Sequence, residues 1–398
     1  MKESDTSLDG VLLEELAALE GAGLRRVLRV LHGRHGARVA EGDHGYVDFS
    51  SNDYLGLATD PRVAGAAIEA LRAAGTGATA ARLISGHHEL HAALEQALAR
   101  FLDVEAALLF PSGYMANLGA IPALAERGDG IYADVLNHAS LIDGCRLSRA
   151  ERHVVPHLDV EALERAIARG GDRLRRRWIV VEGIYSMDGD LSPLAELVAL
   201  ARRTDAWIYL DDAHGVGVLG ATGQGSMERA GGVGEIQVVM GTLGKAFGVA
   251  GAFVAGARAL VDYLANRARA FVYSTGSPPA LAAAARTALE IAVAEPERRD
   301  RLRANARALR AGLAALGWPP PGPEDGHIVP VVIEDSEEML CAAAALRAAG
   351  FLVGAIRPPT VPKGTARLRL TVSAAHSADD VAAVLRALAS ALPAPSAP

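Results

Sequence analysis

The chain has 398 residues, of which 50% are hydrophobic and 22% charged, as expected of a globular protein large enough for two domains. Its formal net charge at pH 7 is 40 − 47 = −7, which argues against nucleic acid or an anionic membrane as its main partner. The two cysteines, Cys145 and Cys341, form no CxxC pair, so we expect reduced thiols and a cytoplasmic location. The polar start MKESDTSLDG has no signal-peptide core, and the final residues APSAP are expected to fray.

The N-terminal part is predicted to be helical. Apolar residues recur at helical spacing over Leu12–Leu31, with a break near Gly21–Gly23. Three arginines, Arg25, Arg26 and Arg29, lie on this stretch. Such arginines usually form a solvated face, but a basic N-terminal helix can also reach an anionic substrate. The sequence leaves both possibilities open.

Short apolar runs then alternate with helical patterns. The expected strands are the start of Tyr46–Leu57, Ala106–Phe110, Gly130–Asp134, Trp178–Val181, Trp207–Leu210 and Val238–Gly241, and the expected helices are Pro61–Ala74, His87–Leu102 and Leu194–Arg203. This rhythm predicts an α/β fold in which helices cover both faces of a mostly parallel sheet. Ligands of such sheets bind at the carboxyl ends of the strands. The polar residues at those ends are His138, Glu182, Ser186, Asp211, His214 and Lys245.

Lys245 follows the strand that ends at Gly241, in a turn of small residues. Desolvation in a tight, uncharged pocket lowers the pKa of a lysine and makes its amine nucleophilic. The alternative is an exposed lysine in a glycine-rich loop. A phosphate-binding P-loop is excluded, because Val239 and Ala246 occupy places where that pattern requires glycine and Ser or Thr.

Two other motifs are interpreted as non-functional. His87 and His91 are spaced i, i+4, but Glu89 lies between His88 and His91 and breaks the HExxH zinc pattern, so no metal site is expected. The run GVGVLG at Gly215–Gly220 matches GxGxxG. Polar, glycine-rich residues follow it where the dinucleotide fingerprint needs an apolar helix, so a Rossmann site is rejected.

The C-terminal third is predicted to form a second, smaller domain. Helices are expected over Ala259–Ala270, Leu281–Ala294 and Arg301–Leu316, and a proline-rich joint covers Trp318–Gly326. A strand, a helix, two strands and a final helix follow, with Ile328–Ile333, Glu337–Ala349 and Ala378–Leu392 as the clearest elements. We expect an N-terminal segment at 1–50, a large cofactor-binding domain at 51–280 and a small α+β domain at 281–398.

The residues at the strand ends together describe a pyridoxal phosphate (PLP) site. A lysine could hold the cofactor, a histidine could stack on its ring, and a buried acid could keep the pyridine nitrogen protonated so that the ring withdraws electrons. The strand, turn and helix start in PSGYMANLGAI would present backbone N–H groups and a positive helix end to the phosphate.

Nine ordered segments make the chain resemble the α-oxoamine synthases, fold-type I PLP enzymes that condense an amino acid with an acyl thioester and release CO₂. The segments are SSNDYLGL, RLISGHHELH, FPSGYMAN, NHASLIDG, EGIYSMDGDLSPL, DDAHGVGVLG, GTLGKAFG, YSTGSPPA and IRPPTVPKGTARLRLTVSAAH. The resemblance covers nearly the whole chain. It implies a seven-stranded sheet, PLP as cofactor, small-molecule substrates and a homodimer with shared active sites. It leaves open the amino acid (alanine, glycine or serine), the acyl chain, and whether coenzyme A or an acyl carrier protein carries that chain.

The resemblance also implies a role for each matching residue. Lys245 would be the Schiff-base lysine, Asp211 would pair with the pyridinium nitrogen, and His138 would stack on the ring and meet the substrate. Further cofactor contacts would come from Gly113, Tyr114, Glu182, Ser186, His214, Thr242 and, from the other subunit, Thr275. Substrate contacts would come from Asn52, Arg357, Thr360 and Arg25, with Arg26 as the alternative to Arg25.

Several positions depart from the family pattern. Tyr114 stands where phenylalanine is common, which the site should tolerate. Gly276 stands where a serine is often found, which puts one hydroxyl near the phosphate or substrate in doubt. His87 and His88 stand where smaller or aromatic residues are common, and the sequence offers no functional reason for them.

Overall fold

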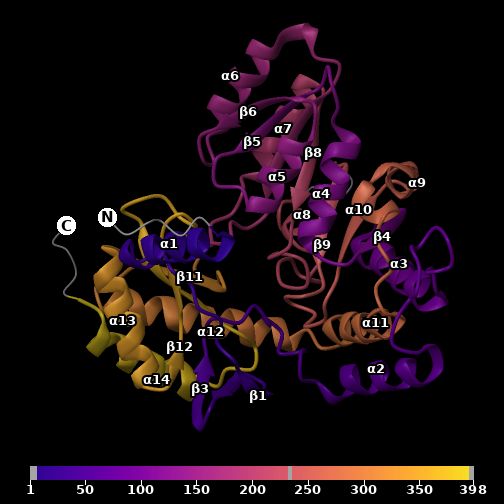
Figure 1. Ribbon diagram of the computed structural model, residues 1–398. Coiled ribbons are helices and arrows are strands. Elements are labelled where there is room, and N and C mark those ends of the chain that lie inside the picture. Colours follow the sequence, from indigo (N-terminus) through magenta and orange to yellow (C-terminus); the bar gives the residue numbers. More distant parts are fainter. Residues whose placement is uncertain (1–6, 232–234, 394–398) are drawn as a thin grey trace.

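The computed structural model describes residues 7–231 and 235–393 (Figure 1). The expected fraying of the last five residues therefore lies outside the described part. Among the helices of these ranges, none combines the length and the apolar character needed to cross a membrane.

A seven-stranded sheet forms the upper and central part of the molecule (Figure 1). Its strand β9, next to the middle strand β8, continues into the Lys245 turn. Strand β10 runs antiparallel to both of its neighbours, and every other pair in this sheet is parallel, which confirms the predicted mostly parallel sheet. From edge to edge the strands are β4 (Ala106–Phe110), β10 (Ala252–Gly256), β9 (Val238–Thr242), β8 (Ala206–Asp211), β7 (Arg177–Glu182), β5 (Gly130–Asp134) and β6 (Glu151–Val155).

Helices cover both faces of this sheet because its strands are apolar on both sides. Successive side chains of a strand point to opposite faces. On β10, Val254 belongs to the core cluster that includes residues of α4 (Gly113–Leu124), α5 (Ala139–Leu147) and α9 (Arg258–Arg267), whereas Phe253 belongs to the cluster that includes residues of α3 (Glu89–Leu102) and α11 (Pro279–Ala294). Nearer β6, helices α6 (Val160–Gly170) and α7 (Leu194–Thr204) complete the covering.

The register of the parallel strands brings carboxylates together at one edge. Glu182, the last residue of β7, is paired with Asp211, the last residue of β8, and Asp211 is in turn paired with Met240 of β9. Because these strands are parallel, their carboxyl ends meet at the same edge of the sheet. The polar residues that follow them are therefore neighbours in space.

The C-terminal part forms a separate small body in the lower left of Figure 1. Its antiparallel sheet has the order β11 (Ile328–Glu334), β14 (Ala366–Thr371) and β13 (Gly354–Ile356). Helices α12 (Glu297–Ala315), α13 (Ser336–Ala348) and α14 (Ala378–Ala391) accompany it, and α12 and α11 run across the lower half of the view, above α14 and α2. The expected order of a strand, a helix, two strands and a final helix is present as β11, α13, β13 with β14, and α14, and the two-residue strand β12 (Phe351–Leu352) is additional. The domain limits at residues 50 and 280 stay a prediction.

A third sheet joins the two ends of the chain. Strand β12 (Phe351–Leu352) pairs in parallel with β3 (His44–Asp48), which continues an antiparallel meander of β1 (His32–His35) and β2 (Arg38–Glu41). The N-terminal strands thus pack with the C-terminal body. The remaining described elements are α2 (Pro61–Ala74), α8 (Ser226–Arg229), α10 (Arg269–Val272) and a 3-10 turn at Gly171–Arg173.

The helix expected over Leu12–Leu31 is wrong in its second half. Helix α1 covers Leu8–Gly21, and residues 24–31 are not helical. The helix ends because Gly23 has a φ of +66° and the N–H of Leu24 turns back to the carbonyl of Leu19. The arginines at positions 25, 26 and 29 therefore lie on an irregular segment and not on a helix face.

Candidate active site

A cavity of about 180 Å³ lies at the carboxyl ends of the central strands. Its walls are Gly113, Tyr114, His138, Ser140, Glu182, Asp211, Ala213, His214, Met240, Thr242 and Lys245. The structure thus brings together all of the residues predicted to contact the cofactor except Ser186 and Thr275. A larger groove of about 1000 Å³ lies at the opposite edge of the sheet, near Trp178 and Trp207 at the starts of their strands, and the described residues that line it include no lysine or cysteine.

The amine of Lys245 faces a histidine within the cavity. Its Nζ lies 2.8 Å from Nε2 of His214. Burial desolvates the ammonium and lowers the pKa of Lys245 from 10.5 to about 8, although the negative charges of Asp211 and Glu182 oppose this shift. About a tenth of Lys245 is therefore uncharged at pH 7, far more than of an exposed lysine, and the uncharged amine is the nucleophilic form.

Asp211 is held in place by a buried amide that the sequence analysis missed. The Nδ2 group of Asn117 donates to Oδ2 of Asp211 and to Oγ of Ser140, each over 2.8 Å, and Oδ1 of Asn117 accepts from the hydroxyl of Tyr209. The backbone N–H of Ala213 donates to the other oxygen of Asp211 over 3.1 Å. Asn117 stands on a buried face of the otherwise apolar helix α4, and that polar residue was the available signal.

His138 and Glu182 form the next part of the wall. His138 is the N-cap of α5, and its backbone N–H donates to Oε1 of Glu182 over 2.5 Å. Nδ1 of His138 lies 2.8 Å from Oγ of Ser140. Burial, with the nearby charge of Asp211, raises the pKa of Glu182 well above its ordinary value. Glu182 is therefore harder to ionise than an exposed glutamate.

The start of α4 is suited to bind an anion. Ser112 caps the helix by accepting from the N–H of Met115, and no residue described by the structure accepts from the N–H groups of Gly113 and Tyr114. A free first turn carries the positive end of the helix dipole. Opposite it, Oγ1 of Thr242 is bonded to the carbonyl of Gly251 over 3.1 Å. These groups fit the phosphate of PLP, as Lys245 and Asp211 fit its aldehyde and ring nitrogen.

Tyr114 keeps its hydroxyl away from the cavity. The hydroxyl donates to Asp143, and the ring, 40% exposed, lies edge-on to His138 with the centroids 6.3 Å apart. Tyr114 thus lines the cavity while its hydroxyl bonds to a residue outside the lining.

The predicted substrate arginines form a separate cluster. Arg357 donates to the carbonyls of Gly23 and Arg25 over 2.7 and 3.1 Å, and Arg26 donates to Oγ1 of Thr360 over 2.9 Å. Arg25 itself is paired with Glu20. These arginines line a second cavity of about 480 Å³ together with Arg29 and Arg347, and none of them lines the Lys245 cavity.

Asn52 and Ser186 are connected by an arginine that the sequence analysis did not single out. Arg369 of β14 lies 3.4 Å from Oδ1 of Asn52, and its Nε donates to the carbonyl of Ser186 over 2.5 Å. The hydroxyl of Tyr54 also donates to Oδ1 of Asn52 over 3.0 Å. The small C-terminal body therefore contacts the loop after β7 and the segment that carries Asn52.

The histidines at 87 and 88 have structural roles. Nδ1 of His87 accepts from the guanidinium of Arg82, which is also paired with Glu95, and His88 caps α3. This cluster adjoins the predicted cofactor residue Thr275, because Ala81 forms a β-bridge with Thr275. Thr275 is not among the residues that line the cavity of its own chain.

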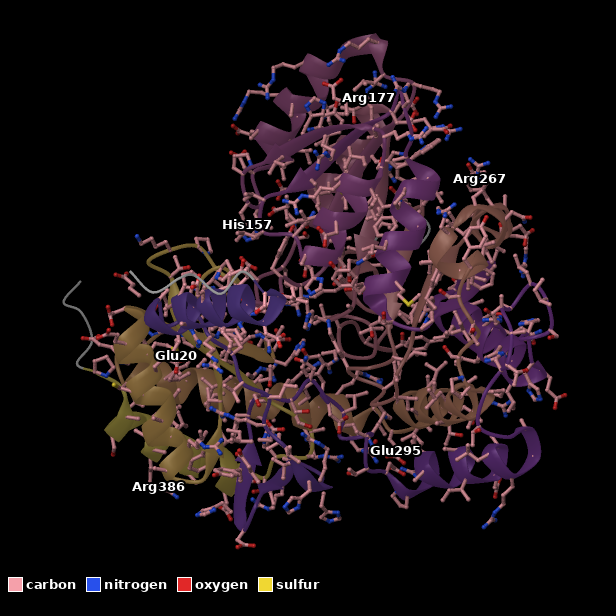
Figure 2. All side chains as sticks on the ribbon, in the orientation of Figure 1. Glu20, His157, Arg177, Arg267, Glu295 and Arg386 are labelled. Carbon is pink, nitrogen blue, oxygen red and sulfur yellow. The ribbon has the colours of Figure 1, made fainter. Side chains whose placement is uncertain are left out.

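His157 forms a further polar cluster near the site edge of the sheet, and Figure 2 shows it at the lower left margin of the upper body. Its two nitrogens lie 2.9 Å from Asp134 and 2.8 Å from Asp190. Burial lowers its pKa, but the hydrogen bonds and charges of the two aspartates outweigh burial and raise the pKa to about 10. The protonated ring ties the end of β5 to the loop after β7.

Known proteins resemble this chain over almost its entire length. The family "Aminotransferase class I and II" matches residues 44–388. An 8-amino-7-oxononanoate synthase from Methylococcus capsulatus is 49% identical, and the match covers 95% of this chain and 97% of that protein. An 8-amino-7-oxononanoate synthase from Anaeromyxobacter dehalogenans is 50% identical, and the match covers 95% of this chain and 94% of that protein. Among solved structures, a serine palmitoyltransferase from S. paucimobilis with a bound PLP–myriocin aldimine is 33% identical, covers 96% of both chains and has a TM-score of 0.90.

Proposed function

The chain belongs to the aminotransferase class I and II family, and within it to the α-oxoamine synthases, and we propose that it is a PLP-dependent acyltransferase that makes 8-amino-7-oxononanoate for biotin biosynthesis. A bond forms between Cα of L-alanine and the carbonyl carbon of a pimeloyl thioester. The thiol leaves, and the alanine carboxylate departs as CO₂. The observation that carries the proposal is the Lys245 amine beside His214, in one cavity with Asp211, in a chain about half identical to synthases of that name.

When bound, PLP supplies an electron sink for the Cα of the amino acid. Lys245 would hold the cofactor and, with a pKa of about 8, could accept and return the Cα proton near neutral pH. Asp211, oriented by Asn117, would hold the proton on the ring nitrogen. The first turn of α4 and Thr242 would bind the phosphate, and His138 would lie against the ring.

The arginine cluster is proposed to receive the carboxylates of the substrates. Arg357, Arg26 and Arg25 gather around Thr360 and the residues that follow α1. Guanidinium groups bind carboxylates through paired, charge-assisted hydrogen bonds. Of the alternatives, Arg26 is the residue that contacts Thr360, whereas Arg25 is engaged with Glu20.

We also propose a cytoplasmic homodimer, with coenzyme A or an acyl carrier protein as the carrier of the acyl group. The two cysteines are free thiols, as is usual in the cytoplasm. A single chain exposes apolar side chains of α1, namely Leu8, Val11, Leu12, Leu13, Leu16 and Leu19. The mass measured by light scattering should therefore be twice the 41.4 kDa of a single chain. A fully active monomer would contradict the shared site.

The test is thiol release by the purified, PLP-loaded protein. L-Alanine, glycine and L-serine are each combined with acetyl-, succinyl-, pimeloyl- and palmitoyl-CoA, with Lys245→Ala as the inactive control. Release confined to L-alanine with pimeloyl-CoA is expected. Release with L-serine and palmitoyl-CoA would instead favour the activity of the structural relative at 33% identity. Since alanine and glycine differ by one methyl group, worth about 1–3 kcal/mol, the ratio of kcat/KM decides between them.

A further inference from the structure

Tyr54 links the amine of Lys245 to Asn52 through the ring of His214. The hydroxyl of Tyr54 lies 2.7 Å from Nδ1 of His214 and 3.0 Å from Oδ1 of Asn52. On the other side of the ring, Nε2 of His214 lies 2.8 Å from Nζ of Lys245. Tyr54 is 0% exposed and His214 5% exposed, so water has little access to these contacts.

Asn52 determines which atoms donate and which accept in these hydrogen bonds. Both terminal nitrogens of Arg369, which can only donate, face the same atom of Asn52 at 3.4 Å, so that atom is the amide oxygen. An amide oxygen only accepts, so the single O–H of Tyr54 must donate to it. The phenol oxygen then has only lone pairs for His214, and Nδ1 of His214 must carry a proton.

The protonation of the ring follows from its surroundings. Burial, together with the positive charge of Lys245, lowers the pKa of His214 well below 6.5, so the ring carries one proton. With that proton on Nδ1, Nε2 is an acceptor and Lys245 is the donor. Burial also raises the pKa of Tyr54 to about 12, which keeps its hydroxyl protonated.

We propose that Tyr54 is a positioning residue, which holds His214 as the Nδ1–H tautomer and presents an unprotonated Nε2 to Lys245. The inference deepens the proposed function, since it takes Lys245 as the reactive amine. The tautomer orients the lone pair of Nε2 into the cavity, where it fixes the Lys245 amine. A ring with the opposite tautomer would place an N–H there and could not accept from Lys245.

Arg369 also interacts with the Tyr54 hydroxyl, but a guanidinium only donates, so Arg369 does not compete for the hydroxyl proton. The ring of His327 packs edge-on to Tyr54 with the centroids 4.2 Å apart, and neither of its nitrogens has a hydrogen-bond partner among the residues described. The charged and titratable groups that act on His214 are Lys245, Arg369, His327 and His138, and those that act on Lys245 include Asp211, Glu182, Asp212 and Arg369. Burial lowers the pKa of His327 to about 3, so it adds no charge at neutral pH.

The direct test is the tautomer of His214 in the full-length protein. Nitrogen-15 NMR of histidine-labelled protein, with and without PLP, distinguishes the two tautomers, and a His214→Gln variant assigns the signal. The wild type is expected to show Nδ1–H. Asn52→Leu frees the Tyr54 proton for Nδ1 and should convert the ring to Nε2–H, whereas Tyr54→Phe removes the preference for Nδ1–H. An Nε2–H ring in the wild type, or an unchanged tautomer in Tyr54→Phe, would overturn the proposal.

A matched control separates positioning from packing. Tyr132→Phe removes another hydroxyl from a fully buried tyrosine, one that has no partner among the described residues, and should leave the His214 signal and the activity unchanged. Tyr54→Phe should lower kcat about 10- to 100-fold with little change in the KM of the acyl donor. An altered tautomer with unchanged kcat would refute the positioning role. If the wild type releases no thiol from any acyl-CoA or from a pimeloyl-carrier protein, the proposed function fails, but the NMR result still decides the role of Tyr54.

Discussion

The side-chain amide of Asn117 donates a hydrogen bond over 2.8 Å to the carboxylate of Asp211. Asn117 is 0% exposed, and its remaining bonds go to Ser140 and Tyr209. A carboxylate that must face a cofactor at the end of a strand has rotational freedom about its side-chain bonds. A rigid helix such as α4 can remove that freedom only by presenting a fixed donor, and Asn117 is that donor.

Replacing this donor should weaken the site without unfolding the protein. Asn117→Leu keeps the approximate volume but leaves Asp211 and the Tyr209 hydroxyl without their buried partner. We expect PLP affinity, measured by absorbance titration, to fall about 10- to 100-fold. As a control, Asn305→Leu removes an amide that bonds to two carbonyls in the C-terminal body and should leave PLP affinity unchanged. Equal affinity in wild type and Asn117→Leu would contradict the role of Asn117.

The lowered pKa of Lys245 has a consequence that can be measured before any turnover. The amine is the reactive form, and a pKa lowered from 10.5 to about 8 makes it the main form above pH 8. The rate at which cofactor-free protein takes up PLP should rise with pH and level off with a midpoint near 8. A rate that keeps rising towards pH 10 would show that the cavity does not desolvate Lys245.

The His157 cluster should stabilise the fold over a defined pH range. The folded-state pKa of about 10 is raised above the ordinary 6.5, so the contribution is complete below pH 6.5 and is lost as pH rises through about 10. Replacing His157 by Gln should cost about 2 kcal/mol at pH 6, because it removes charge-assisted bonds to Asp134 and Asp190. The loss should shrink between pH 6.5 and 10.

Urea denaturation of both proteins across this pH range measures the difference. His35→Gln, at an exposed position of β1, serves as the control and should not change the free energy of unfolding. A destabilisation by His157→Gln that is constant from pH 6 to pH 10 would mean that the ring acts through packing and not through charge.

Gly248 shapes the loop that carries Lys245. Its φ is +66°, and a Cβ atom at this position would lie 2.4 Å from the backbone nitrogen of Ala58. Gly248→Ala should therefore lower the free energy of unfolding by about 2 kcal/mol or more, from backbone strain and overpacking, and should reduce PLP binding by displacing the turn. Gly65→Ala provides the opposite case. Gly65 lies inside α2 with open space around it, so alanine should stabilise the protein by about 0.5–1 kcal/mol.

Thermal unfolding of these two variants tests whether the close contact is real. A Gly248→Ala protein with an unchanged Tm and normal PLP binding would contradict the packing at Ala58, while Gly65→Ala shows that the assay detects a change of either sign.

The main sheet could be predicted because strands that are buried on both faces consist of continuous runs of apolar residues. Ala106–Phe110 is buried at every position, and its range was predicted to the residue. Strand β6 (ERHVV) was missed because an edge strand with one exposed face retains polar side chains. Strand β10 (AFVAG) was missed because it follows the Lys245 turn without an intervening helix. The helix over residues 24–31 was predicted from spacing alone, which carries no information on the positive φ of Gly23.

The cavity residues could be predicted because each follows a strand of the same sheet, and parallel strands end at one edge. The residues that hold the cavity residues in position could not be predicted from the sequence. Tyr54 and His214 are 160 positions apart, and Arg369 reaches Asn52 from the other end of the chain. Such contacts depend on how the C-terminal body packs on the sheet, and no local spacing encodes that arrangement.

The central claim is tested most directly with L-alanine carrying carbon-13 in its carboxyl group. Incubated with pimeloyl-CoA and the PLP-loaded protein, the label should be released as CO₂, one molecule for each free thiol, and the unlabelled product should have the mass of 8-amino-7-oxononanoate. Retention of the label in an acylated product, or thiol release without consumption of alanine, would contradict a decarboxylating condensation at Lys245.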